Sequence, residues 1–346
     1  MKRILMLFGG VALLLGAAIS PAAAKGTSLF ATAKHLTVGV VLDVGGVDDK
    51  SFNHLAYIGL QKAQTKYKVK GFFVVSNAAA EYVPNLTNFA AHDNMAIGVG
   101  FNMEQAVLTV ATQFPHKKFA LVDGCPADAN FVCHNQANVA NLFFKEQESG
   151  YLVGVLTGLM EKGHYAGLHR NVVGAMGGVS IPPVNRYIAG YVAGVHKVDP
   201  RAKILLGYSQ SFTNQGAGNL IGRAQIGNGA EVLFQVAGSS GLGYLHAAQQ
   251  LGKYGIGVDA DQGYLGKYIL TSALKRVNVA VQLIIRDVVA GKFRGGDHLY
   301  NLKNNGTGFG KTSKAVPASV VSQVKHYEQL IKTGKIVPPA AIGPLG

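Results

Sequence analysis

The sequence predicts an α/β protein with two doubly wound parallel-sheet lobes. Short, almost continuously apolar strands alternate with amphipathic helices along the chain, a pattern typical of parallel sheets that are covered on both faces. The strand–helix units are too numerous for one compact sheet. A chain of 346 residues, 48% of them hydrophobic, is long enough for two domains with cores of their own.

Four strands and four helices are predicted in the first half of the chain. The strands are "LTVGVVLD" (36–43), "GFFVVSN" (71–77), "MAIGVG" (95–100) and "KFALVDG" (118–124). The helices are expected over residues 53–67, 83–91, 103–114 and 145–162. Apolar residues of the first helix recur at helical spacing, and Ser51 or Asn53 is available as its N-cap.

The second half repeats the alternation. Its strands are "NVVGAMGG" (171–178), "AKILLGYS" (202–209), "EVLFQVAG" (231–238) and "YGIGVDAD" (254–261). Its helices are expected over residues 185–198, 218–229 and 243–252. Together the two halves favour two doubly wound domains.

Gly150, Gly154 and Gly158 recur every fourth residue in the helix predicted over 145–162. The same spacing occurs where membrane helices dimerise. The apolar part of this helix is only about ten residues long, which is too short to cross a bilayer. We therefore interpret the glycines as a groove that lets the helix pack closely against a sheet or a neighbouring helix.

Residues 1–24 have the features of a secretion signal. "MKR" is followed by a long apolar stretch, and Ala22–Ala24 form a small-residue cleavage site before Lys25. An uncleaved membrane anchor is the alternative, but the apolar stretch is at the short limit for a span. No cysteine lies near the cleavage site for lipid attachment. We expect the mature chain to be soluble and periplasmic.

The chain is basic, with a formal net charge of +14 that falls to +12 when Lys2 and Arg3 leave with the signal. A nucleic-acid-binding protein would concentrate its basic residues along one face or helix. Here they are scattered, with no run of five. We interpret the charge as a diffuse surface property, useful near an anionic membrane, and expect no nucleic-acid partner.

Cys125 and Cys133 are the two cysteines of the chain. In an oxidising compartment, a pair eight residues apart favours a local disulfide that holds a loop. Free thiols are one alternative. A metal site that includes His134 is another, although two cysteines and one histidine at this spacing match no zinc pattern.

The sequence lacks the motifs of known catalytic and cofactor sites. "VAGSSGLGYLHA" follows a strand and opens a helix, but His246 stands where the dinucleotide fingerprint needs a glycine. The chain has no GxxxxGK[ST], GxSxG or HExxH motif, and its eleven histidines are scattered singly. We therefore expect no enzyme, no cofactor and no metal.

Acidic and aromatic residues gather at the carboxyl ends of the predicted strands, where open α/β sheets bind ligands. Asp43, Asp123 and Asp259 each end a strand, and Phe212 and Gly238 follow one. Each of them has an ordinary explanation as a cap, a turn residue or a core residue. Their shared location is what suggests a joint function.

The segment "VGVVLDVGGVDDKSFNHLAYIGLQKA" resembles the opening of the basic membrane protein family, the purine-nucleoside-binding receptors of bacterial ABC importers. "KFALVDG", "KEQESGYLVGVLTGLM", "YSQSFTN", "QVAGSSGLG", "GVDADQ" and "LTSALKRVNVAV" resemble later blocks of the family, in family order. The resemblance implies a two-lobed, periplasmic-binding-protein-like fold of type I, with a hinge and a nucleoside held in the cleft.

The resemblance also implies roles for particular residues. Phe52 and Phe212 match the two aromatic rings that sandwich the base. The ribose and base edges would contact Asp43, Asp123, Gly238, Asp259 and Lys275. The first lobe is expected over residues 25–140 plus about 259–292, and the second over 141–258 plus about 293–346.

These observations predict a receptor that captures a purine nucleoside and delivers it to an inner-membrane ABC permease and its ATPase. Stacking on an aromatic ring contributes roughly 1–3 kcal/mol per base, and acids in the cleft repel phosphate. The alternatives are another heterocycle, a sugar-like ligand, or a periplasmic sensor. A nucleoside hydrolase is disfavoured, since neither a calcium-binding acid cluster nor an organised general base is evident.

Overall fold

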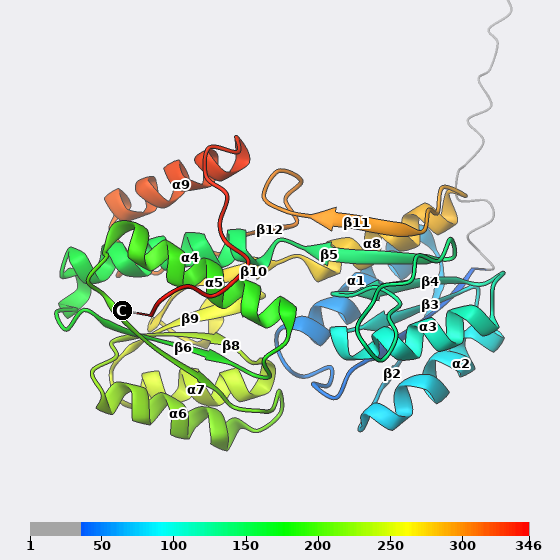
Figure 1. Ribbon diagram of the computed structural model, residues 1–346, viewed down its shortest axis with the longest axis horizontal. Helices are drawn as coiled ribbons and strands as arrows, with labels where there is room; N and C mark the ends of the chain where they lie inside the picture. Colours follow the sequence, from blue (N-terminus) through cyan, green and yellow to red (C-terminus); the bar gives the residue numbers. More distant parts are fainter. Residues whose placement is uncertain (1–35, 346) are drawn as a thin grey trace, which may run out of the picture.

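The computed structural model describes residues 36–345, which form two lobes side by side, each built on its own six-stranded sheet (Figure 1). The predicted secretion signal, residues 1–24, lies outside the described residues. Parallel sheets with helices on both faces confirm the predicted fold class. We call the lobe that contains β1 the first lobe and the lobe that contains β6 the second.

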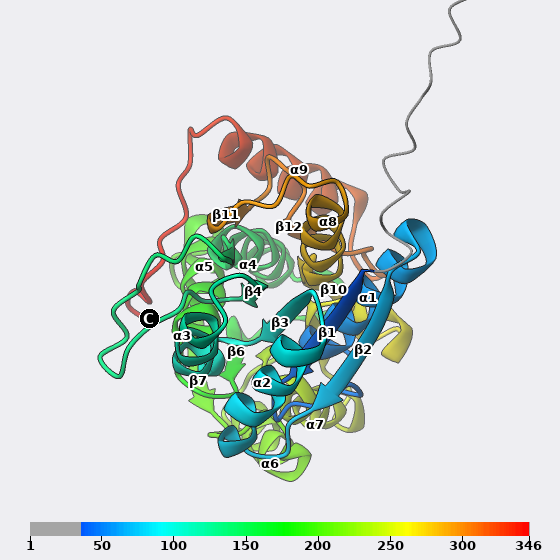
Figure 2. The same cartoon turned by 90° about the vertical axis from the view of Figure 1, so that its right-hand side faces the viewer.

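The first sheet has the strand order β11-β5-β4-β3-β1-β2, and all of its strand pairs are parallel. Helices α1 and α8 pack on one face and α2 and α3 on the other (Figure 2). The strands are β1 Thr37–Leu42, β2 Lys70–Val75, β3 Met95–Val99, β4 Lys118–Val122, β5 Val139–Phe144 and β11 Gly296–Tyr300. The helices are α1 Phe52–Tyr67, α2 Tyr82–His92, α3 Glu104–Gln113 and α8 Val277–Val289.

The second sheet has the order β12-β10-β9-β8-β6-β7 and is parallel except for the pair β10–β12. Helices α4, α5 and α9 pack on one face and α6 and α7 on the other. The strands are β6 Val172–Gly177, β7 Lys203–Tyr208, β8 Val232–Val236, β9 Tyr254–Asp259, β10 Ile269–Lys275 and β12 Thr307–Phe309. The helices are α4 Glu146–Lys162, α5 Pro182–Val198, α6 Gln215–Gly227, α7 Gly238–Gln250 and α9 Ala318–Lys332.

The chain crosses between the lobes three times: from β5 to α4, from β10 to α8, and from β11 to β12. This strand pairing differs from the predicted lobe ranges. Those ranges place β10 in the first lobe and β11 and most of β5 in the second, whereas the sheets contain them the other way round. The physical reason is that β10 pairs with β9 and β11 with β5, and pairing between distant strands leaves no local pattern in the sequence.

Helices α4 and α5 pack in unusually close contact because their glycines face each other's backbone. A Cβ atom at Gly154 would lie 2.2 Å from the carbonyl oxygen of Tyr191, and one at Gly190 would lie 2.1 Å from that of Gln147. The predicted glycine groove is therefore confirmed, with a neighbouring helix as its partner. Within residues 36–345, no helix has the length and apolarity needed to cross a membrane.

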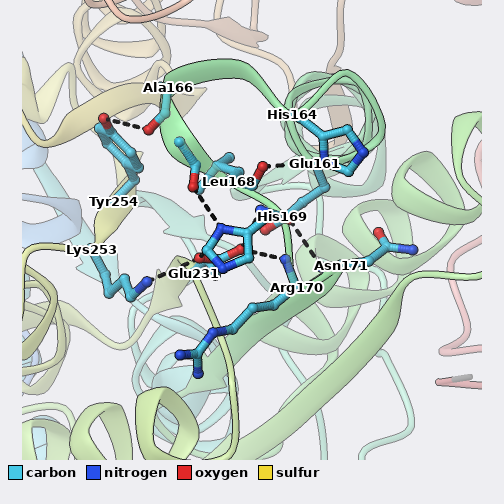
Figure 3. A network of polar contacts seen from close by, with 11 residues as sticks. Glu161, His164, Ala166, Leu168, His169, Arg170, Asn171, Glu231, Lys253 and Tyr254 are labelled. Atoms are coloured by element: carbon cyan, nitrogen blue, oxygen red, sulfur yellow. Dashed lines mark hydrogen bonds and ion pairs between the residues drawn. The ribbon is translucent and has the colours of Figure 1, made fainter.

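A buried polar network lies at the amino ends of the second sheet's strands (Figure 3). Glu231, which directly precedes β8, accepts backbone N–H groups of His169 and Arg170 at 2.7 Å each and pairs with Lys253 Nζ at 3.0 Å. Burial raises the pKa of neighbouring Glu161 to about 8, and the charge of Glu231 adds to this effect. Glu231 is thus well compensated, whereas an ionised Glu161 is not.

Candidate functional site

One cavity lies between the lobes, at the carboxyl ends of both sheets. The space between its lining atoms is about 600 Å³, including the part that opens to solvent. The structure brings all seven predicted ligand-binding residues to this cavity: Asp43, Phe52, Asp123, Phe212, Gly238, Asp259 and Lys275.

Asp43 directly follows β1 and is held by two hydrogen bonds to one of its oxygens. Its Oδ1 accepts from Gly45 N and from Asn53 Nδ2, both at 2.8 Å. Gly46, with a φ of 74°, makes the tight turn that returns the chain toward α1. Among the described residues none donates to Oδ2, so this oxygen is available to a ligand. Burial raises the pKa of Asp43 to about 6.

Asp49 fixes the loop that carries Phe52. Its carboxylate accepts the backbone N–H groups of Ser51 at 2.9 Å, Asn53 at 2.8 Å and His54 at 3.1 Å. These are the amide groups that the start of a helix leaves without intrahelical partners. Asp49 therefore positions the first turn of α1, and with it the Phe52 ring, at the edge of the cavity.

The rings of Phe52 and Phe212 reach the cavity from opposite lobes. Phe52 opens α1 and packs partly on the core of the first lobe. Phe212 follows β7 and packs partly on the core of the second. Gly178 makes room for this second ring, because a Cβ atom there would lie 2.4 Å from the Phe212 ring carbons. Two aromatic residues thus line one cavity.

Asp259 joins the two lobes across the cavity. Its Oδ2 accepts from Ser51 Oγ, in the first lobe, at 2.6 Å, and its Oδ1 accepts from the Tyr187 hydroxyl at 3.0 Å. Its backbone φ of 59° is in the left-handed region, a conformation that is uncommon for residues other than glycine. Burial raises the pKa of Asp259, while the charge of Lys275 opposes the rise.

Lys275, the last residue of β10, lies at the centre of a buried charge cluster. Its Nζ contacts Asp123 Oδ2 and lies 2.9 Å from Glu146 Oε1. Arg186 Nε donates to the second oxygen of Glu146 at 2.6 Å. The ammonium also lies 5.1 Å from the centre of the Phe52 ring, within the range of a cation–π contact. The two carboxylates and the two cations therefore compensate one another's charge, beside the Phe52 ring that is predicted to stack on the nucleobase.

Asp123 follows β4 with a φ of 72° and belongs to the first lobe, so its pair with Lys275 also bridges the lobes. Burial raises the pKa of Asp123 to about 7, although the charge of Lys275 opposes the rise. Its other oxygen, Oδ1, is buried without a hydrogen-bond partner among the described residues. A ligand that donates a hydrogen bond would satisfy this oxygen.

A disulfide joins Cys125 and Cys133 in the loop after Asp123, so the predicted bridge is present. The loop carries Phe131, whose ring stacks on Phe101 with centroids 5.6 Å apart. Phe101 in turn lines the cavity. Within residues 36–345, no group of three His, Cys, Asp or Glu side chains is placed to hold a metal ion.

The cavity is also shaped by residues that were not expected to bind the ligand, among them Asn53, which was expected only as an N-cap. Asn53 and Asp49 hold its first loop, Tyr187 holds Asp259, and Glu146 with Arg186 holds Lys275. Glu146 stood inside the quoted block "KEQESGYLVGVLTGLM", and Asn53 directly follows Phe52. Tyr187 and Arg186 carried no signal, because they lie inside an ordinary amphipathic helix.

Comparison with known proteins places the chain among transport receptors. Residues 36–341 match the sequence model of a family described as ABC transporter substrate-binding protein PnrA-like. The chain is 33% identical over 350 residues to the CD4+ T-cell-stimulating antigen of Listeria monocytogenes, with 94% of both chains covered. It is 32% identical over 333 residues to the ABC transporter nucleoside-binding protein BmpA of Lactococcus lactis, covering 88% of this chain and 89% of that one.

A solved structure supports the same fold. The ABC transporter system solute-binding protein from Aeropyrum pernix superposes with a TM-score of 0.79 and 28% sequence identity. The alignment covers 88% of this chain and 94% of that one. The periplasmic-binding-protein-like fold of type I that the resemblance implied is therefore confirmed.

Proposed function

The chain belongs to the PnrA-like family of ABC transporter substrate-binding proteins, and on that premise we propose that it captures a purine nucleoside between its lobes and delivers it to an ABC permease. It is a substrate-binding protein and not an enzyme. The permease and its ATPase lie in the inner membrane in this proposal, and the receptor works in the periplasm after its signal is removed.

The placement of Phe52 and Phe212 is the observation that carries the proposal. Two aromatic rings that border one cavity from opposite lobes suit a flat heterocycle, because each base–ring stack contributes roughly 1–3 kcal/mol. The nucleoside-binding name of the Lactococcus lactis relative supports the same ligand class. Closure about the three crossovers brings the rings onto the two faces of the base.

The carboxylates of the cavity favour a nucleoside over its phosphorylated form. Asp43, Asp123 and Asp259 can accept hydrogen bonds from ribose hydroxyls or from N–H groups of the base. A phosphate group would meet these acids as a like charge in a partly desolvated site. Lys275 is already paired with Asp123 and Glu146, so it does not offer a free cation to a phosphate.

The test is a calorimetric titration of ligand-stripped protein with adenosine, guanosine and inosine, their monophosphates, the free bases and ribose. We expect a nucleoside to bind and the monophosphates to bind at least about tenfold more weakly. Phe52→Ala and Phe212→Ala should each weaken nucleoside binding by about 5-fold to 150-fold, the equivalent of one lost stack.

Phe73→Ala is the matched control, since Phe73 is 42% exposed on β2 and does not line the cavity. It should bind like the wild type. If both cavity variants also bind like the wild type, the site is wrong. If ribose and other sugars bind and nucleosides do not, the ligand class is wrong.

A further inference from the structure

The end of the first lobe opposite the cavity is basic. All strands of the first sheet are parallel, so their amino ends share one edge, onto which Figure 2 looks. Six cations lie in or beside the loops that enter β2, β4 and β11. We call them the basic end: Lys68, Lys70, Lys117, Lys118, Lys292 and Arg294.

These cations belong to one continuous surface. Asn94, before β3, donates to the Thr37 carbonyl at 3.1 Å, and Lys118 N donates to the Asn94 carbonyl at 3.4 Å. Lys118 Nζ lies 5.3 Å from the centre of the ring of Phe293, a residue that stands between Lys292 and Arg294 in the sequence. The loops before β1, β3, β4 and β11 therefore adjoin one another.

Only Lys117 among the six cations of the basic end has a nearby acid in the described residues, Asp93, whose pKa is raised by burial while the charge of Lys117 opposes the rise. Among the described residues, none of its six cations forms an ion pair, and Lys117 Nζ donates instead to the backbone carbonyl of Asp93 at 2.7 Å. The Asp93 side chain is buried, and Asp297 accepts from Asn141 Nδ2 at 2.9 Å. At the corresponding end of the second sheet, Glu231 holds Lys253 (Figure 3), while the exposed Arg170, Arg201 and Lys203 form no ion pair with a described residue.

The described chain begins at this end. The carbonyl of Leu36, the first described residue, accepts from Lys70 N at 2.9 Å. Phe72, half exposed at 50%, lies two residues further on β2, at the free edge of the sheet. A basic surface with an exposed aromatic ring suits the interface of an anionic bilayer.

We propose that the basic end is a docking surface for an anionic lipid bilayer. The lysines and Arg294 bind the headgroups, and Phe72 enters the interfacial region at the edge of the contact. The cavity lies at the opposite ends of the same strands, so docking leaves it open to the ligand. This proposal is independent of which ligand the cavity binds.

The test is co-sedimentation of the purified chain with vesicles of phosphatidylcholine, with and without phosphatidylglycerol. One variant reverses four exposed charges of the basic end: Lys68→Glu, Lys70→Glu, Lys292→Glu and Arg294→Glu. The matched control reverses four exposed lysines of the second lobe: Lys267→Glu, Lys311→Glu, Lys314→Glu and Lys325→Glu. Both change the net charge equally, and both should keep the wild-type ligand affinity.

We expect the wild type to prefer the anionic vesicles and to lose this preference in high salt. A basic side chain at an anionic surface strengthens binding by roughly fivefold, so the basic-end variant should bind at least about 50-fold more weakly. The control should stay within a few fold of the wild type. Equal losses in both variants would show that net charge alone is responsible, and wild-type binding without preference for anionic lipid would also overturn the proposal.

Discussion

Replacing Lys275 by methionine removes the positive charge from a site that holds two buried carboxylates. Lys275 is 2% exposed, and its Nζ contacts Asp123 and lies 2.9 Å from Glu146. Methionine fills a similar volume, so packing is largely preserved. Removing one partner of a buried ion pair costs about 3–5 kcal/mol, since the other charge is left uncompensated. For a chain of this size that lowers Tm by about 5–10 °C.

The loss should depend on pH in a definite direction. Burial raises the pKa of Asp123 to about 7 even though the Lys275 charge opposes the rise, so removal of the lysine moves that pKa higher still. A carboxyl whose pKa is higher in the native state than in the unfolded chain stabilises the native state when it is protonated. The variant should therefore recover stability as the pH falls from about 8 to about 6.

Differential scanning calorimetry of wild type and Lys275→Met across this pH range measures the effect. Lys311→Met is the control, because Lys311 is exposed and forms no ion pair with a described residue, and it should change Tm by less than about 1–2 °C. A Tm deficit that stays constant, or that grows toward low pH, would refute the reasoning that the unpaired Asp123 carboxylate causes it, since Glu146 keeps its pair with Arg186.

Three further predictions concern stability. Replacing Cys125 and Cys133 together by serine should lower the free energy of unfolding by about 2–3 kcal/mol, as expected for a bridge that closes a short loop, and reduction should unmask two thiols in the wild type only. The pKa of Glu161 is raised to about 8, so its charged form opposes folding. Glu161→Gln should therefore raise Tm near pH 8 by removing a penalty of about 3–5 kcal/mol, and it should have little effect near pH 4. An equal change of Tm at both pH values would contradict this. Gly154→Ala should destabilise the chain by at least about 1–3 kcal/mol, since its Cβ would meet the Tyr191 backbone. Gly227→Ala is the control: no atom lies within 4 Å of its new Cβ, so it should raise stability by up to about 1 kcal/mol. Equal effects of the two substitutions on stability would exclude the proposed clash.

Local patterns predicted the strand–helix units well. The strand predicted over 36–43 is β1 Thr37–Leu42, and the helix predicted over 53–67 is α1 Phe52–Tyr67. These elements are strongly periodic and end in turns with clear chemistry. The convergence of Asp43, Asp123 and Asp259 on one cavity followed from a single rule, that parallel strands end at the same edge.

The long-range pairing was not predictable in the same way. Strands β5, β10, β11 and β12 were not among the predicted elements, and β10 and β11 belong to sheets opposite to the predicted lobe ranges. β11 and β12 are short, and β11 alternates between exposed and half-buried residues. Their pairing depends on the folded neighbours and not on their own composition. The partners of Lys275 were hidden for the same reason, since Asp123 is 152 residues away.

Acidic and basic residues are distributed differently between the interior and the surface of the protein, and the net charge does not reveal this difference. Most of the 18 acidic residues are buried, whereas Lys275 is the one lysine or arginine that is buried among residues 36–345. The surface is therefore more basic than the formal charge of +14 indicates. The cavity is acidic, although the chain as a whole is basic. A buried carboxylate costs stability unless it is compensated, and Asp43 and Asp123 both have raised pKa values. We therefore expect a ligand that donates hydrogen bonds to Asp43 and Asp123 to relieve that cost and to stabilise the protein.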